Sequence, residues 1–203
     1  MTTDKLNDET KNILQRVLKN LEIWASQTGF KFAQGKTEIL ICNRKIPASI
    51  QKIDLTLDGH KVKCVGEKKF LGLWFDHRML WTTHIEHLKN ECSRSLKLLK
   101  TVALSKTKTD TKILLRIYKT LILPKLDYGS VAYGTASQQT LKKLDPIQNQ
   151  ALRLSLGAFH TTPIISLEIE SNLHSLSYRR KILGIKYYKG CAKETNHYLW
   201  RVY

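Results

Sequence analysis

The stretch Ile53-Asp-Leu-Thr-Leu-Asp-Gly-His-Lys-Val-Lys-Cys-Val65 decides the fold class of this 203-residue chain. Its apolar and polar residues alternate on both sides of Asp58-Gly59, and this dipeptide is typical of the two-residue turn of a β-hairpin, where both positions need a positive φ. The pattern predicts strands over 53–57 and 60–65. Short apolar segments predict further strands over 38–42 and 69–75.

Helical periodicity flanks this β region on both sides. Residues 10–28 carry apolar side chains at spacings of three and four, and Gly29 stands where a helix C-cap is expected. A capping box, Thr83-His-Ile-Glu86, predicts the start of the next helix. Three more helices are expected: from Asp110 to Leu123, ended by Pro124; over 138–156, restarting at Asp145-Pro146 and ending at Gly157; and over 178–189. A helix, a small antiparallel sheet and a helical remainder predict an α+β fold.

The charge of the chain is its most unusual bulk property. Thirty-four Lys and Arg residues stand against seventeen Asp and Glu, which gives a net charge of +17, while the 42% hydrophobic content is that of a folded protein. A chain this basic suggests a polyanionic partner. Its four cysteines are scattered without a C-x-x-C pair, which is typical of reduced thiols in an intracellular protein and does not separate nucleus from cytoplasm. We expect no membrane partner, since no apolar run approaches the ~20 residues of a membrane span.

A row of cations is predicted on the helix that starts at Asp110. At 100° per residue, Lys108, Arg116 and Lys119 fall within ~40° of Lys112, and the opposite arc carries the apolar residues Ile113, Leu114, Ile117 and Leu121. A solvated helix face explains such a row, and so does contact with phosphates. The +17 excess favours phosphate-backbone binding without base-specific readout.

The sequence offers no catalytic carboxylate pair. Two-metal phosphoryl transfer needs at least two acids around ions ~3.5–4 Å apart, and the chain has no Asp-Asp and no Asp-x-Asp. Asp76, Asp127 and Asp145 are interpreted as turn or cap residues. His84 and His87 suggest a polar helix flank and Cys92 a small buried side chain, because a second ligand pair for zinc is missing. We therefore predict no metal site.

Several motifs resemble one family in unbroken order from about residue 12 to 190. Leu21-Glu-Ile-Trp-Ala-Ser-Gln-Thr-Gly-Phe-Lys-Phe-Ala-Gln-Gly-Lys-Thr-Glu-Ile-Leu40 and Lys68-Lys-Phe-Leu-Gly-Leu-Trp-Phe-Asp76 are similar to the end of the palm and the primer-grip hairpin in reverse transcriptases of non-LTR, jockey-like retrotransposons. Leu121-Ile-Leu-Pro-Lys-Leu-Asp-Tyr-Gly-Ser-Val-Ala-Tyr-Gly134 and Leu144-Asp-Pro-Ile-Gln-Asn-Gln-Ala-Leu-Arg153 resemble the thumb and the connection. The resemblance implies a palm remnant over 1–76, thumb helices over 77–135 and a helical connection over 136–203.

The resemblance also implies roles for individual residues. Lys36 matches a lysine that approaches the incoming nucleotide and acts as general acid, although a surface lysine at a strand start explains it equally well. Phe70, Leu71 and Gly72 match the primer grip, where Gly72 would let the backbone approach the primer; a bulge in a half-buried strand is the alternative. With Lys108, Lys112, Arg116 and Lys119 they form the expected nucleic-acid contacts.

The chain departs from the family pattern at the catalytic centre. The [FY]-x-D-D loop that precedes the first helix in the family is missing, so we expect an inactive fragment of an RNA-directed DNA polymerase, without a cofactor of its own, whereas the intact enzyme uses Mg²⁺. The expected partner is the backbone of an RNA–DNA or DNA duplex. Two alternatives stay open: a thumb and grip subunit for a polymerase chain that carries the aspartates, and a relic of a mobile element without function.

Overall fold

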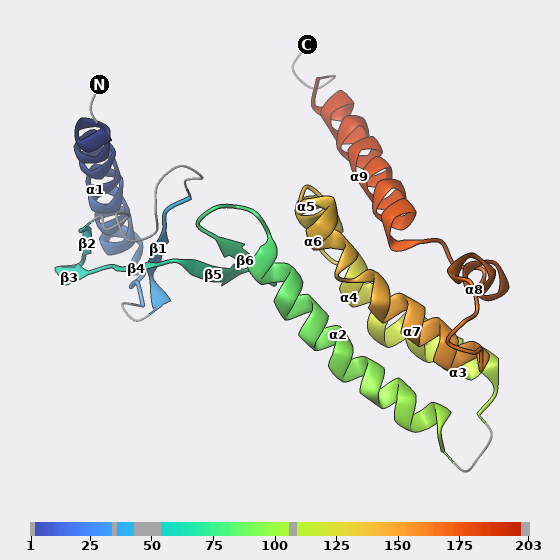
Figure 1. Ribbon diagram of the computed structural model, residues 1–203. Helices are drawn as coiled ribbons and strands as arrows, with labels where there is room; N and C mark the ends of the chain where they lie inside the picture. The colour runs from blue at the N-terminus through green and yellow to red at the C-terminus, as the bar shows by residue number, and fades with distance from the viewer. Residues whose placement is uncertain (1–2, 34–35, 43–53, 106–108, 200–203) are drawn as a thin grey trace. The chain divides into compact units, whose positions relative to one another are not determined.

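The computed structural model describes residues 3–33, 36–42, 54–105 and 109–199. Their contacts divide the chain into two compact units, unit 1 (Met1–Met79) and unit 2 (Leu80–Tyr203) (Figure 1). All described strands belong to unit 1, and unit 2 is helical in its described part, which confirms the α+β fold class. No helix in the described ranges has both the length and the apolar composition that crossing a membrane requires.

Unit 1 begins with the predicted helix and contains the predicted hairpin. Helix α1 (Thr3–Thr28) is ended by Gly29, whose φ is 75°. The N–H of the next residue, Phe30, donates a hydrogen bond to the Ala25 carbonyl. Strands β2 (Thr56–Leu57) and β3 (His60–Lys61) pair antiparallel around Asp58-Gly59. Both turn residues have positive φ, 50° and 73°, as the sequence predicted.

Two side chains of α1 hold this hairpin against the helix. The Gln15 amide donates to the Thr56 carbonyl at 2.9 Å and accepts from the Thr56 N–H at 3.0 Å. About two helical turns further along, the Glu22 carboxylate accepts from the Asp58 N–H at 2.7 Å. The small core of unit 1 forms around this contact, from Ala25, Leu55, Leu57 and Val62.

The remaining strands differ from the sequence prediction in two ways. Strand β1 (Glu38–Leu40) pairs parallel, not antiparallel, with β4 (Lys63–Val65). The segment 69–75, predicted as one strand from its apolar residues, is a hairpin of β5 (Glu67–Phe70) and β6 (Leu73–Asp76), as the resemblance of 68–76 to a hairpin implied. The chain reverses at Leu71-Gly72, where φ is 45° and 81°, because two consecutive positive φ values turn an extended chain back on itself.

Unit 2 is built on the helix that follows the hairpin. Helix α2 (Thr82–Ala103) buries the face that was predicted from the sequence, formed by Ile85, Leu88, Cys92, Leu96 and Leu99. The other elements follow along the chain, α3 to α7 packing into a bundle with α2. The described elements of unit 2 are α2 (Thr82–Ala103), α3 (Thr111–Ile117), the π-helix η3 (Tyr118–Ile122), α4 (Leu123–Asp127), α5 (Ser130–Tyr133), α6 (Gln138–Lys142), α7 (Asp145–Leu156), α8 (Ile164–Ser171) and α9 (Leu176–Leu199).

Three local expectations for unit 2 are wrong. The N-cap of α2 is Trp81 in the left-handed region, without a side-chain cap, so Thr83 and Glu86 form no capping box. The helix from Asp110 does not stop before Pro124, because the wider π turn of η3 accommodates the missing proline N–H and α4 continues the same path. His84 is not on a polar flank: it is buried, with ring centroids 5.1 Å from Tyr133 and 6.2 Å from Trp81.

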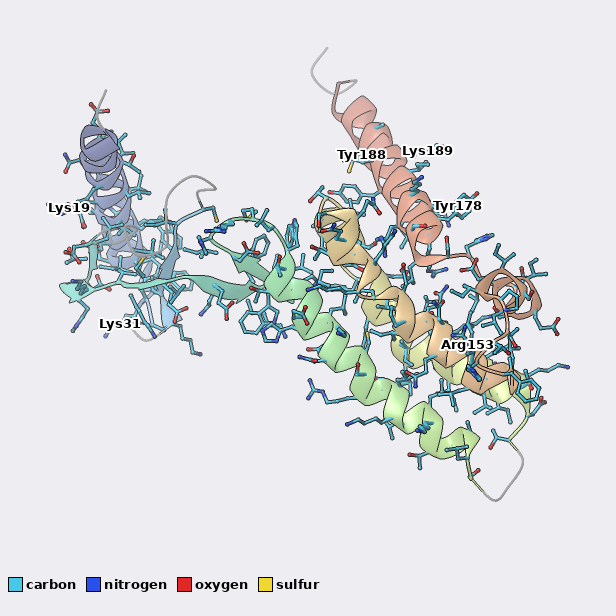
Figure 2. The ribbon with its side chains drawn as sticks, in the orientation of Figure 1. Lys19, Lys31, Arg153, Tyr178, Tyr188 and Lys189 are labelled. Atoms are coloured by element: carbon cyan, nitrogen blue, oxygen red, sulfur yellow. The ribbon has the colours of Figure 1, made fainter. Side chains whose placement is uncertain are left out.

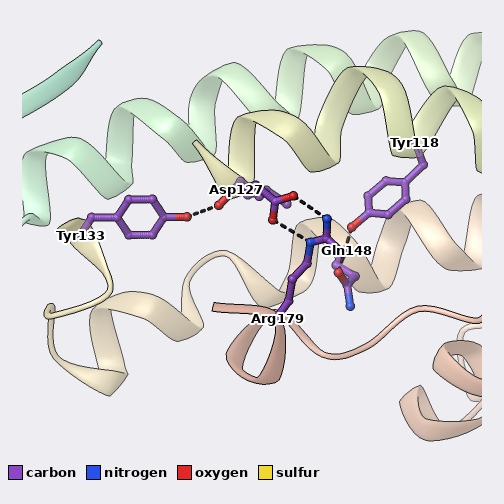
Figure 3. Close-up of polar contacts among 6 residues, drawn as sticks. Tyr118, Asp127, Tyr133, Gln148 and Arg179 are labelled. Atoms are coloured by element: carbon purple, nitrogen blue, oxygen red, sulfur yellow. Dashed lines mark hydrogen bonds and ion pairs between the residues drawn. The ribbon is translucent and has the colours of Figure 1, made fainter. Parts of the chain in front are cut away.

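Buried polar contacts fix the helices of unit 2 to one another (Figure 3). The Tyr118 hydroxyl donates to Gln148 at 2.9 Å, and the Gln148 amide donates to the His174 carbonyl at 3.0 Å. Arg179, in the first turn of α9, binds both oxygens of Asp127 at 2.7 and 2.6 Å. Such a bidentate pair fixes direction as well as distance, so α9 leaves the bundle at a defined position.

Candidate nucleic-acid interface

Three of the predicted cations form a row on the surface of unit 2. Lys112, Arg116 and Lys119 are exposed on the continuous helical path of α3 and η3, and we call them the basic row. At about 1.5 Å of rise per residue the row is ~10 Å long. The phosphates of one strand are spaced about 3.4 Å along the axis of a duplex, so the row spans the axial length of about three of them. Lys108, the fourth predicted member, lies outside the described residues.

The helix carrying the basic row begins at the predicted residue. The Asp110 carboxylate accepts from the Lys112 N–H at 3.1 Å, which is an N-cap contact. Its buried face differs from the predicted arc, however. Leu114, Tyr118 and Ile122 are buried, whereas Ile113 and Leu121 are 52% and 45% exposed. The buried face of the helix includes Tyr118 because its hydroxyl donates to the buried Gln148 side chain. The periodicity of the aliphatic residues alone does not predict that a tyrosine is buried.

The predicted grip residues lie together at one end of unit 1. Phe70, Leu71 and Gly72 form the tip of the β5–β6 hairpin, which we call the hairpin tip, and the side chains of Phe70 and Leu71 are 63% and 74% exposed. Phe70 contacts Phe75 with ring centroids 6.4 Å apart. The structure therefore places Gly72 in a turn and not in a strand bulge, with two large apolar side chains beside it open to a ligand.

Lys36 is exposed, directly before β1. Two residues later Glu38 binds Lys68 of β5 at 2.5 Å, and this bond with the Lys68 ammonium lowers the pKa of the Glu38 carboxyl. The ion pair joins the strand after Lys36 to the hairpin that carries the tip. An exposed lysine fits the surface interpretation and is compatible with a nucleotide contact.

The described acids do not fit a site for the two Mg²⁺ ions of the family. Asp54 pairs with Lys61, Asp76 accepts from the Arg78 N–H at 3.0 Å, and Asp127 binds Arg179. Asp145 starts α7, and burial raises the pKa of its carboxyl. Across the described ranges, no three His, Cys, Asp or Glu side chains come together in a metal-binding group. Asp127 is thus a structural anchor and not a simple turn residue.

Basic side chains also cover other parts of both units (Figure 2). Lys19 extends from α1 in unit 1, and Arg153 of α7 donates to the Thr162 carbonyl at 3.3 Å in unit 2. Helix α9 carries Arg180, Lys181, Lys186 and Lys189 among tyrosines. Sequence reasoning assigned no binding role to these residues. The sequence feature that could have indicated this surface is Lys186-Tyr-Tyr-Lys189, since cations beside aromatic rings are typical of nucleic-acid surfaces.

Sequence comparison supports the motif resemblance. The chain is 25% identical over 153 residues to the RNA-directed DNA polymerase from the mobile element jockey of Drosophila funebris, which covers 74% of this chain and 16% of that protein. It is 22% identical over 169 residues to the probable RNA-directed DNA polymerase from transposon BS of Drosophila melanogaster, covering 83% of this chain and 18% of that protein.

The chain is similar to retrotransposon RNA-directed DNA polymerases. The jockey protein of Drosophila melanogaster is 23% identical over 146 residues, again 16% of its length, so the chain spans a small part of the curated proteins that it matches. No protein-family model matches the chain. No solved structure matches it either.

Proposed function

We propose that this chain binds the sugar-phosphate backbone of a primer–template duplex, with the basic row on one strand and the hairpin tip at the primer end. The observation that carries the proposal is the basic row itself: three exposed cations on one face of a helix whose other face is anchored in the core by Tyr118. A rigid helix presents its charges without the entropic cost of ordering a loop. The net charge of +17 adds long-range attraction.

The assigned activity is binding and not polymerisation. The relatives carry polymerase names, but Asp54, Asp76, Asp127 and Asp145 of this chain are engaged in ion pairs, a turn and a helix start. Phosphoryl transfer by two metal ions requires carboxylates free to coordinate them. We therefore assign this chain no step through Mg²⁺.

The test is a triple substitution in the basic row, Lys112→Gln, Arg116→Gln and Lys119→Gln. These side chains are exposed, so thermal unfolding should move little. Affinity for an RNA–DNA hybrid duplex, measured by fluorescence anisotropy at several salt concentrations, should fall. The slope of log affinity against log salt should decrease by about 0.9 for each lost phosphate contact.

A matched control separates the row from bulk charge. The triple variant Lys11→Gln, Lys19→Gln and Lys31→Gln removes three exposed cations from unit 1. Its net charge is therefore the same as that of the basic-row variant. Its salt slope should stay close to that of the original chain. Equal slopes for both triple variants, or a flat slope for the original chain, would exclude a specific role of the row.

A further inference from the structure

A groove with a volume of about 280 Å³ lies in unit 2 where α5 packs against α9. We call it the α5–α9 groove. Its wall from α9 includes Arg180, Lys181 and Tyr188, and the opposite wall includes Thr135 and Gln138. None of its lining residues belongs to the basic row or the hairpin tip, so it is a separate surface.

The cations of this groove are available to an anion. Arg179 is engaged by Asp127, but Arg180 and Lys181, which follow it, form no ion pair with any described carboxylate. The positive charge of Arg180 also interacts at longer range with the carboxyl of the partly buried Asp145. Lys181 is exposed and is therefore the more accessible of the two cations. A guanidinium and an ammonium that line one groove are groups that proteins use to bind phosphate.

An aromatic ring stands on the same face of α9. Tyr188 follows Arg180 by eight residues and Lys181 by seven, spacings that keep side chains on one side of a helix. Its side chain is 69% exposed and makes an edge contact with Tyr187, at 5.9 Å between ring centroids. Between the cations and the ring lies Gly184, which has no side chain to fill the groove.

We propose that the α5–α9 groove binds one unpaired nucleotide of a single-stranded nucleic acid, with its base stacked on Tyr188 and its phosphate held by Arg180 and Lys181. The volume lies near the lower end of small-molecule sites, which begin at about 300 Å³ and are too small for a duplex. Cations combined with a stacking ring are the means by which proteins hold single strands without reading their sequence. This inference goes beyond the proposed function, because it concerns another surface and an unpaired strand.

Glycine substitutions on α9 test the groove directly. A Cβ at Gly184 or at Gly190 would meet nothing within 4 Å, so both positions accept a side chain. Gly184→Leu places an aliphatic side chain inside the groove, and Gly190→Leu makes the same change on the same helix outside it. Binding of a fluorescein-labelled oligothymidylate, followed by anisotropy, should weaken about tenfold in Gly184→Leu and stay unchanged in Gly190→Leu. Equal affinities in the two variants would overturn the proposal.

Substitutions of the ring separate stacking from charge. Tyr188→Phe should keep the affinity for oligothymidylate, whereas Tyr188→Ala should lose about 5- to 150-fold, the usual cost of one stacked base. Helix content measured by circular dichroism checks that both variants fold. If Tyr188→Ala binds like Tyr188→Phe, no base stacks there. Duplex binding that still depends on the basic row would then leave the proposed function standing while the groove proposal fails.

Discussion

Leu71 occupies a backbone conformation that its side chain disfavours. Its φ is 45°, in the left-handed region, where an ordinary side chain costs about 1–2 kcal/mol, and yet the side chain is 74% exposed. Packing within unit 1 therefore does not explain the leucine. The ligand contact proposed for the hairpin tip would explain it, since strained residues concentrate at functional sites.

Substituting Leu71→Asn should separate stability from binding. Asn-Gly is a preferred dipeptide for this turn, so we expect unit 1 to gain about 1 kcal/mol in its free energy of unfolding by denaturant. Affinity for a primer–template with a recessed end should fall at the same time. A variant that is more stable and binds equally well would show that the leucine has no role at the primer end.

Ionisable groups in the core of unit 2 should make it sensitive to alkali. Burial raises the pKa of the Cys92 thiol from 9.0 to about 11, and burial also raises the pKa of the Tyr118 and Tyr133 hydroxyls. The folded state keeps these protons while the unfolded chain releases them, so stability is complete below pH 9 and declines above it. At about 1.4 kcal/mol per unit of pKa, Cys92 alone accounts for about 2–3 kcal/mol.

Urea unfolding at pH 8 and pH 10.5 measures this effect, with Cys92→Ala as the control. The variant loses some packing at both pH values but should show a smaller difference between them. An identical pH difference in the variant would mean that Cys92 takes no part.

Among the elements, the turns and caps set by neighbouring residues were predicted correctly, whereas the contacts between residues far apart in the sequence were not. Gly29, Asp58-Gly59 and the Asp110 cap act through the backbone within a few residues, and the structure confirms all three. The π turn before Pro124 was missed because the sequence does not show how a wider turn restores the helical path. The bond between Arg179 and Asp127, fifty-two residues apart, depends on tertiary packing, and so does the groove beside α9.

Helix α5 should depend on the size of residue 134. A Cβ at Gly134 would lie 2.5 Å from the backbone oxygen of Ser130, so Gly134→Ala must displace the helix. We expect a loss of about 1–3 kcal/mol in stability, as for other overpacked sites. Gly184→Ala on α9 meets no neighbour and should gain about 0.5–1 kcal/mol. Thermal melting compares the two; similar shifts would contradict the close approach at α5.

At the scale of the whole molecule, exposed apolar side chains favour association between copies of the chain, whereas its net charge opposes it. Ile13, Val17, Leu21 and Trp24 form a stripe along α1 and are 40–53% exposed. At 100° per residue this stripe lies on the side of α1 opposite Gln15 and Glu22, which hold the β2–β3 hairpin. The apolar periodicity that predicted the helix therefore does not mark its buried face. Stripes of this kind favour association.

Salt should decide between these opposing forces. At low ionic strength the net charge of +17 keeps copies of the chain apart, whereas at 1 M salt the Debye length falls to about 3 Å and the repulsion is screened. We expect sedimentation velocity to show a smaller average mass at low salt and a larger one at high salt. Val17→Glu with Trp24→Glu should abolish the increase, because each adds a charge inside the stripe. Lys112→Gln with Lys119→Gln, which lowers the charge in unit 2 instead, should strengthen association at low salt. A chain that stays monomeric at every salt concentration would show that the stripe is too weak to bind a second copy.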